Sequence, residues 1–157
     1  MNKTSVLKPP EIKIIIRNRI KADNRIKINS SAIAFKNLLE IWDMDTIELM
    51  EQSKIILLDR QLRMIGISHI STGGTNMCIC DPKIVFAVAL KSRASSIILA
   101  HNHIYGDTEP SRADFLYTTN IAASGKILDI DILDHLIISK HKYYSFRDND
   151  VMPKIEE

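Results

Sequence analysis

The stretch SSIILAHNHIYGDTEPSRADF, residues 95–115, leads from an apolar run through a crowded polar loop into a helix start. SSIILA predicts a short buried strand near the centre of a sheet, because uninterrupted apolar strands are typical of that position. Ser111 and Asp114 have the spacing of a capping box and predict the first turn of a helix. Two histidines and two carboxylates lie between these elements, at a strand end where sheets often place ligands.

Patterns on either side of this stretch predict further elements. Ser30 or Ser31 can cap one helix, and Asp81 followed by Pro82 is a typical opening of another. The predicted helices span residues 28–43, 83–94 and 111–126, and the predicted strands span residues 11–21, 54–59, 62–72, 95–100, 127–139 and 142–146. The order β-α-β-β-α-β-α-β-β predicts an α/β domain with helices packed on a mixed central sheet.

The composition is that of a folded globular chain. The protein has 157 residues, of which 45% are hydrophobic and 25% are charged, so one domain with a substantial core is expected. The longest apolar runs are too short to cross a bilayer, and the N-terminus has no apolar segment followed by a cleavage site. We therefore expect a cytoplasmic protein with no membrane partner.

The first 30 residues are basic, although the formal net charge of the chain is only +2. Eight basic residues stand there against Glu11 and Asp23, which gives a local charge of +6. The basic residues are Lys3, Lys8, Lys13, Arg17, Arg19, Lys21, Arg25 and Lys27. Such an arm can contact phosphates, but a solvated strand face is favoured because no aromatic residue is interleaved to stack on bases. DNA is kept as an alternative partner.

Cys78 and Cys80 are the two cysteines of the chain. Residues at this spacing on a strand seldom have disulfide geometry, so two reduced and mostly buried thiols are the favoured interpretation. The alternative is half of a Cys/His zinc site, but no second cysteine pair accompanies them.

His101 and His103 are separated by one residue at the end of the predicted central strand. In extended backbone, residues at this spacing project to one side, so the two imidazoles can share one metal ion. Asp114 in the first helical turn points toward the mouth of the same loop and can supply an oxygen ligand. Three protein ligands and one open position are typical of catalytic zinc, which lowers the pKa of a bound water to about 7.

A hydrolase of this kind needs a carboxylate that takes a proton from the water and returns it to the leaving amine. Glu48, Glu51, Asp107 and Glu109 are candidates on chemistry alone. Asp107 and Glu109 lie in a loop with a glycine and a proline, where solvated turn residues are common. Spacing alone does not choose between Glu48 and Glu51.

The arrangement His101-x-His103, seven residues and then Ser111-x-x-Asp114 resembles the JAMM motif, also known as JAB or MPN+, of zinc metallo-isopeptidases. SSIILAHNH…G…EPSRAD, followed by LDIDILDHLII and YYSF, closely resembles the C-terminal domain of the bacterial RadC family. The resemblance covers roughly residues 47–146. The helix-hairpin-helix region of longer family members is not evident, so the chain resembles the short form of the family.

The resemblance implies a fold and a set of roles. JAMM domains share a three-layer, cytidine-deaminase-like architecture, expected here over residues 31–147, between a basic arm or strand at 1–30 and a flexible tail at 148–157. In the family, two histidines and an aspartate bind zinc, a glutamate just before a strand is the general base, and a serine stabilises the oxyanion. The corresponding residues are His101, His103, Asp114, Glu51 and Ser111, with Glu48 as the reserve base.

The implied activity is that of a zinc metallopeptidase or isopeptidase, in which zinc-bound water attacks an amide carbonyl of a peptide or protein. A rival from another class is a DNA-associated accessory protein with a structural or vestigial metal site, since family members carry a DNA repair label. A zinc nucleobase deaminase is disfavoured. Those enzymes carry His-x-Glu and Cys-x-x-Cys motifs, whereas this chain has His-x-His and no Cys-x-x-Cys.

Some positions depart from the family pattern or leave two interpretations open. Ile104 and Tyr105 replace the usual Pro-Ser, which keeps the ligands but changes the loop that shapes the cleft. Residues 78–82 replace the frequent HPRE and remove its charges. Asp134-His135 places a carboxylate beside an imidazole on a strand, where neighbours face opposite sides. A structural histidine is favoured there, and a group behind the metal ligands is the alternative.

Overall fold

The computed structural model describes residue 13, residues 15–73 and residues 80–155. The helices are η1 (Ala22–Asn24, a single 3-10 turn), α1 (Ser31–Leu39), α2 (Pro82–Ser92) and α3 (Arg112–Ile127). The strands are β1 (Gln52–Leu58), β2 (Met64–Thr72), β3 (Ser96–Asn102), β4 (Asp131–Ile138) and β5 (Tyr143–Ser145). The three predicted helices and five of the six predicted strands are confirmed, with their ends shifted by a few residues.

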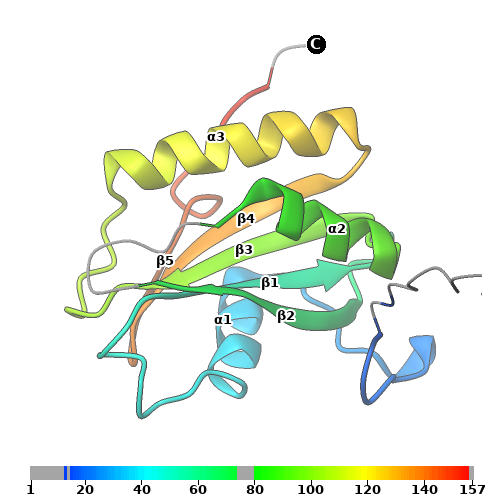
Figure 1. Cartoon of the computed structure of the whole chain (residues 1–157), viewed down its shortest axis with the longest axis horizontal. Helices are drawn as coiled ribbons and strands as arrows, with labels where there is room; N and C mark the ends of the chain where they lie inside the picture. The colour runs from blue at the N-terminus through cyan, green and yellow to red at the C-terminus, as the bar shows by residue number, and fades with distance from the viewer. Residues whose placement is uncertain (1–12, 14, 74–79, 156–157) are drawn as a thin grey trace, which may run out of the picture.

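The described strands form a five-stranded sheet in the order β2-β1-β3-β4-β5 (Figure 1). β1 is antiparallel to both β2 and β3, β4 is antiparallel to β5, and β3 and β4 run parallel. The apolar strand β3 lies in the centre, as its sequence predicts. Because α3 follows β3 in the chain, the carboxyl end of β3 and the start of α3 meet at one end of the sheet.

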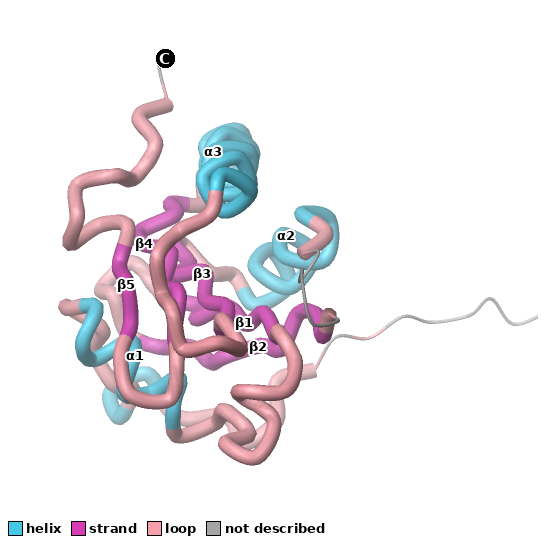
Figure 2. Tube along the Cα trace, turned by 90° about the vertical axis from the view of Figure 1, so that its left-hand side faces the viewer, coloured by secondary structure: helices cyan, strands magenta, loops and turns pink. Residues whose placement is uncertain are grey.

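Helices cover both faces of the sheet and make three layers (Figure 2). α2 and α3 pack on one face, where Ile55 and Leu57 of β1 join a core cluster with Val85, Ala89 and Ile121. The second cluster, on the face that α1 covers, includes Ala34, Leu38, Trp42, Ile56 and Leu58. Successive residues of β1 alternate between the clusters because side chains on a strand point to opposite faces. The predicted three-layer α/β fold with a mixed sheet is confirmed.

Local capping signals determine where the helices begin. Ser30 and Asp81 each accept a hydrogen bond from a backbone N–H in the first turn of α1 and α2. α3 begins with a complete capping box, in which Ser111 Oγ accepts from the Asp114 backbone N–H and Asp114 Oδ2 accepts from the Ser111 N–H. The capping box thereby holds Asp114 at a defined place near the end of β3.

The predicted strand over residues 11–21 is wrong in the part that the structure describes, which contains no strand. The exposed apolar side chains of this part include Ile15, Ile16 and Ile20. A bridge between Lys27 and Arg63 joins the following segment to the sheet, just before β2. A β-branched run has high strand propensity, but it forms a stable strand only when a neighbouring strand or a packed face receives it.

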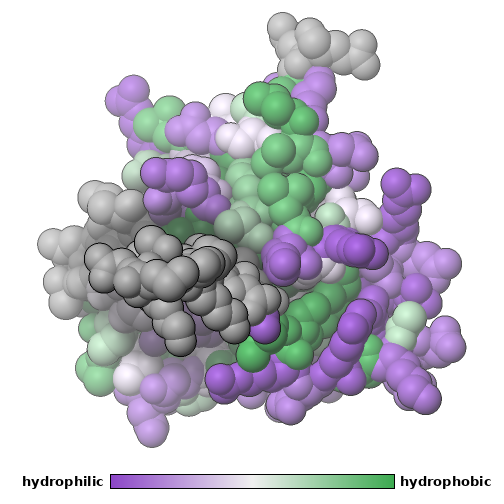
Figure 3. Space-filling view, turned by 45° about the vertical axis from the view of Figure 1, so that its right-hand side comes forward, coloured by the Kyte–Doolittle hydropathy of each residue, from purple (hydrophilic) through white to green (hydrophobic). Residues whose placement is uncertain are grey.

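The surface mixes polar and apolar side chains. Figure 3 shows hydrophobic side chains exposed in a band between hydrophilic ones on one face of the molecule. Large apolar side chains that are exposed on the helices include Leu90, Leu116 and Ile127. Within the part of the chain that the structure describes, no helix combines the length and the apolar character needed to cross a membrane.

Candidate metal centre

Three side chains with metal-ligand chemistry converge where β3 leads into α3. His101 lies near the end of β3, His103 follows the strand, and Asp114 belongs to the first turn of α3. His101 Nε2 lies 3.1 Å from His103 Nε2 and 3.2 Å from Asp114 Oδ1, while His103 Nε2 lies 3.8 Å from Asp114 Oδ2. One ligand atom from each residue therefore lies within 4.8 Å of the other two. The three residues predicted to bind zinc are brought together.

This donor set fits a zinc ion. Two imidazole nitrogens and one carboxylate oxygen are among the ligands that zinc accepts in proteins, and three protein ligands are typical of catalytic sites. His101 is buried, and His103 and Asp114 are half-buried, so the ligand atoms are partly shielded from water. All three residues also line the cleft described below.

Asp114 caps its helix and faces the histidines at the same time. Its Oδ2 accepts hydrogen bonds from the backbone N–H of Ser111 at 2.7 Å and from Ser111 Oγ at 2.6 Å, while Oδ1 faces His101. Burial acts to raise the pKa of Asp114, but the hydrogen bonds and charge of His101 and the hydrogen bonds of Ser111 outweigh it and hold the pKa well below its usual range. Capping and metal binding therefore do not compete for this carboxylate.

His135 lies directly behind the candidate metal ligands. Its Nε2 is 2.9 Å from His101 Nδ1, and its Nδ1 is 2.6 Å from Thr118 Oγ1. Burial is the main reason why the pKa of His135 lies well below that of a free histidine, so the ring is neutral at pH 7. The sequence favours a structural histidine here, and the contact of the ring with the candidate ligand His101 is what the alternative interpretation expects. Asp134 faces the other side of the sheet, as strand alternation predicts.

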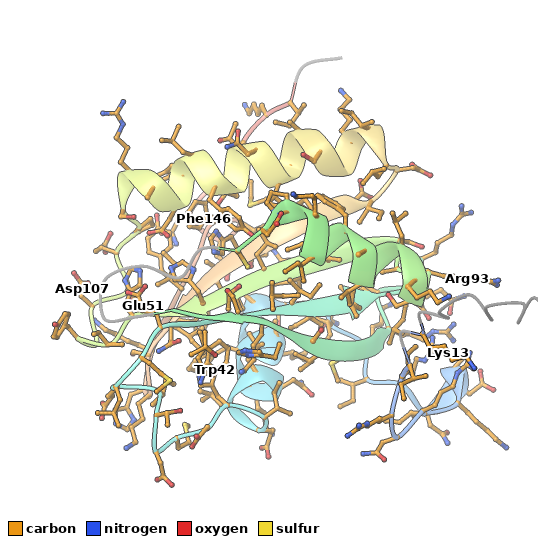
Figure 4. All side chains as sticks on the ribbon, viewed as in Figure 1. Lys13, Trp42, Glu51, Arg93, Asp107 and Phe146 are labelled. Carbon is orange, nitrogen blue, oxygen red and sulfur yellow. The ribbon has the colours of Figure 1, made fainter. Side chains whose placement is uncertain are left out.

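A cleft of about 550 Å³ opens beside the three candidate ligands. Glu51 and Ser111 both line it, whereas Glu48 is exposed and is not part of the lining. Glu51 precedes β1 directly, and two residues later Ser53 pairs with His101, so Glu51 lies at the same end of the sheet as the histidines. Figure 4 shows Glu51 and Asp107 together at this end. The structure therefore distinguishes the two glutamates that spacing could not.

The loop after His103 is held by its own hydrogen bonds. His103 Nδ1 lies 2.9 Å from the Asp107 carbonyl oxygen, and Asp107 Oδ1 accepts from the backbone N–H of Glu109. Ile104 is buried, whereas Tyr105 is 83% exposed and lines the cleft. Of the two residues that depart from the family pattern, one anchors the loop and the other forms part of the rim.

Cys80 also lines the cleft, but it is not among the converging metal ligands of the described residues. Its thiol is buried and lies 2.8 Å from Ser53 Oγ. Cys78 lies outside the described residues. The favoured interpretation of a buried thiol holds for Cys80.

Comparison with known proteins identifies the family. A family model described as the RadC-like JAB domain matches residues 28–151, which is most of the chain. The chain belongs to the RadC-like JAB domain family. The resemblance seen in the sequence is thereby confirmed.

Curated relatives of this RadC-like chain are named UPF0758 proteins. The one from Alkaliphilus metalliredigens is 42% identical over 102 residues, which cover 65% of this chain and 44% of the relative. The one from Thermotoga maritima is 34% identical over 122 residues, covering 78% and 53%, and one from Clostridium perfringens is 33% identical over 138 residues, covering 87% and 59%. The RadC-like chain spans about half the length of the curated relatives it matches.

The candidate metal centre of this RadC-like chain has one neighbouring residue that sequence reasoning does not single out. Thr118 is buried, and its hydroxyl contacts both His135 and the backbone carbonyl of Asp114. The sequence offers a modest signal, because Thr118 lies four residues after Asp114 and therefore on the same helix face. Recognising its contact with His135 requires the packing of α3 on β4.

Proposed function

We propose that this chain is a zinc-dependent metallohydrolase of the JAMM type that cleaves an amide bond in a peptide or protein. The observation that carries the proposal is the convergence of His101, His103 and Asp114 beside a cleft that Glu51 lines. A carboxylate that is not a member of the ligand set, next to a set of three ligands, is the arrangement that hydrolytic chemistry requires.

Each side chain has a separate role in this proposal. A zinc ion bound by the three ligands would act as a Lewis acid and supply a nucleophilic water at neutral pH. Glu51 takes the proton of the attacking water and returns it to the leaving amine nitrogen. Ser111 Oγ, exposed at the start of α3, donates its proton to Asp114 Oδ2 in this structure, and in the reaction it turns this proton to the oxyanion that forms on the amide carbonyl, a contribution of roughly 3–4 kcal/mol.

The charge of the cleft supports an amide substrate over a nucleic acid. The described residues that line the cleft include no lysine or arginine. The lining carboxylates are Glu51, Asp107, Glu109 and Asp114. A phosphodiester would meet this negative charge without a basic side chain to pair with it, whereas an amide is neutral.

A second candidate function, DNA association with a structural metal, rests on the basic arm. Lys13, a described residue of the arm, lies at the end of the molecule opposite Glu51 (Figure 4), so a phosphate contact of Lys13 would be remote from the cleft. Removing residues 1–30 would then abolish a salt-sensitive binding of DNA while hydrolysis stays undetectable. Metal-dependent peptide cleavage without DNA binding would exclude this function.

The decisive experiment combines metal analysis with peptide cleavage. The purified protein is expected to hold one zinc ion per chain, and Glu51→Gln is expected to keep the ion but to cleave a peptide library at least about 100-fold more slowly. Glu48→Gln is the matched control, because Glu48 lies three residues earlier, is exposed and does not line the cleft. A protein that binds no zinc, or a Glu51→Gln variant that cleaves as fast as the unchanged protein, would overturn the proposal.

A further inference from the structure

A chain of hydrogen-bonding groups runs behind His101, away from the cleft. His101 Nδ1 lies 2.9 Å from His135 Nε2, and His135 Nδ1 lies 2.6 Å from Thr118 Oγ1. Thr118 Oγ1 donates to the backbone carbonyl of Asp114 at 2.6 Å. Both middle residues are buried, since Thr118 is 0% exposed and His135 is 1% exposed. This series of hydrogen bonds therefore links two candidate metal ligands, His101 and Asp114, through the protein interior.

The last acceptor determines the direction of every hydrogen bond in this chain. A carbonyl oxygen can only accept a hydrogen bond, so the Thr118 hydroxyl donates its proton to the carbonyl of Asp114. The Thr118 oxygen must then accept a hydrogen bond from His135 Nδ1–H. A neutral imidazole that carries its proton on Nδ1 has a lone pair on Nε2, which accepts from His101 Nδ1–H. A proton of His101 is thereby held on Nδ1, and Nε2 is the ring nitrogen that faces His103 and Asp114.

The second ligand histidine is held in the same tautomer by a shorter route. His103 Nδ1 lies 2.9 Å from the carbonyl oxygen of Asp107, so this nitrogen must be the donor. Each ring therefore keeps a proton on Nδ1, and Nε2 is the nitrogen that can release its proton to bind a metal ion. His101 in β3 and His103 in the following loop thus present the same ring nitrogen to the same point. The tautomer of each ring is determined by a backbone carbonyl that can only accept a hydrogen bond.

We infer that Thr118 and His135 are positioning residues, which hold His101 in the tautomer that binds metal through Nε2 and connect it to the backbone of Asp114. The inference rests on the proposed metal centre and assigns roles to two residues that do not touch the metal or the substrate. Groups that hydrogen-bond to metal-bound histidines fix the orientation of the ring and raise its basicity as a ligand.

Packing alone does not account for a histidine at position 135. The ring stacks on Phe146 at a centroid distance of 4.9 Å, a contact that an apolar ring would make equally well. Burying a polar imidazole is costly unless both nitrogens find partners, and in this structure both partners belong to the chain that ends at the metal ligands. The polar character of position 135 therefore serves His101.

The inference is tested by changing the hydroxyl of Thr118 while keeping its volume. Thr118→Val removes the hydroxyl, and Thr118→Ser retains it, so the two variants differ in the hydrogen bond. We expect Thr118→Val and His135→Phe to lower the affinity for Zn²⁺ or Co²⁺ by about 10–100-fold in a chelator competition, and Thr118→Ser to restore it to within a few-fold of the unchanged protein. Equal affinities for Thr118→Val and Thr118→Ser would overturn the inference.

A spectroscopic measurement separates positioning from general loss of structure. In the metal-free protein, ¹⁵N NMR is expected to show His101 protonated on Nδ1, and Thr118→Val is expected to shift that signal toward a mixture of tautomers while the melting temperature stays close to that of Thr118→Ser. An unchanged tautomer would contradict the inference. Neither readout needs a substrate, so the absence of peptide cleavage would count against the proposed function and leave this inference standing.

Discussion

Asp134 and His135 are neighbours on β4, yet they belong to two hydrogen-bond networks of different kinds. Asp134 accepts from Ser31 Oγ at 2.8 Å, from Ser145 Oγ at 2.7 Å and from the backbone N–H of Arg147 at 3.0 Å. We call this set the closed network. His135 joins Thr118, His101 and Asp114 on the other face of the sheet, in what we call the open network, because it ends at the cleft.

The comparison sets a network that lies within the fold beside one that ends at the candidate metal centre. In the closed network the partners of Asp134 are hydroxyl and backbone N–H groups of the fold, including the N–H of His135 at 2.8 Å, and the network joins α1, β4 and β5. In the open network the last atoms are the Nε2 nitrogens and the Asp114 carboxylate, which face one another across a space suited to an ion. Breaking the first network should affect folding, and breaking the second should affect metal binding.

The largest effect is expected from removing a ligand of the open network. His101→Ala deletes a ring nitrogen that faces the ion and should lower zinc affinity by more than about 100-fold, beyond the cost of losing an outer partner. The unfolding midpoint of the metal-free protein should change little in comparison. Inductively coupled plasma analysis and denaturant titration measure the two quantities. Full zinc occupancy in His101→Ala would show that the three residues do not form the site.

The closed network should give the opposite pattern. Asp134→Ala leaves the Ser31 and Ser145 hydroxyls and the Arg147 N–H without their buried acceptor, which should lower the free energy of unfolding by about 3 kcal/mol. Zinc stoichiometry should stay at that of the unchanged protein at temperatures where the variant is folded. A loss of zinc at unchanged stability would erase the distinction between the two networks.

The two networks should also respond to pH with opposite sign. Burial raises the pKa of Asp134, so this group favours folding below its unfolded pKa and the contribution is lost as pH rises through the folded value. Asp114 has a lowered pKa, so its contribution is present above the unfolded pKa of 3.8 and is lost as pH falls through the folded value. Without metal, Asp134→Asn should steepen the rise of unfolding free energy between acidic and neutral pH, and Asp114→Asn should flatten it.

Denaturant titrations in a chelating buffer at several pH values check this prediction. The unchanged protein supplies the reference slope. A flattened curve for Asp134→Asn would mean that its carboxylate is stabilised rather than penalised in the folded state.

The smallest effect is expected at the rim of the cleft. Tyr105→Ser, which restores a residue common in the family, should leave the free energy of unfolding within about 0.5 kcal/mol because the side chain is 83% exposed. It should raise KM for a cleaved peptide by about fivefold, the equivalent of about 1 kcal/mol, with kcat unchanged. Ile127→Ser, at an 85% exposed position outside the cleft lining, is the control. An unchanged KM would remove Tyr105 from substrate binding.

Much of this fold could be predicted from the sequence because its signals are local. Capping residues such as Ser30, Asp81 and Ser111 determine helix starts through bonds that span only a few residues. The apolar run before His101 marks a central strand for an equally local reason. The convergence of the three candidate ligands could be predicted too, because His101 and His103 share a strand end and Asp114 follows in the next element.

The parts that could not be predicted depend on contacts between distant segments. The apolar run at residues 11–21 has strand propensity, but its described part has no neighbouring strand in the sheet. The role of His135 depends on the parallel pairing of β3 with β4, which places it beside His101. Local sequence cannot supply that register. Spacing alone likewise could not choose between Glu48 and Glu51. The family resemblance favoured Glu51, and the pairing of β1 with β3 places Glu51 at the end of the sheet where the histidines lie.

The backbone around the metal centre is unevenly held. His101 pairs with Ser53 of β1 on one side and with Ile137 of β4 on the other, so a strand ladder fixes its position twice. His103 lies beyond the end of the strand, in the loop that includes Tyr105. The position of His103 therefore depends on the loop, and that of His101 does not. If the proposed ion binds here, substitutions in the loop should change the rate at which the ion exchanges, whereas its equilibrium affinity should report the network behind His101.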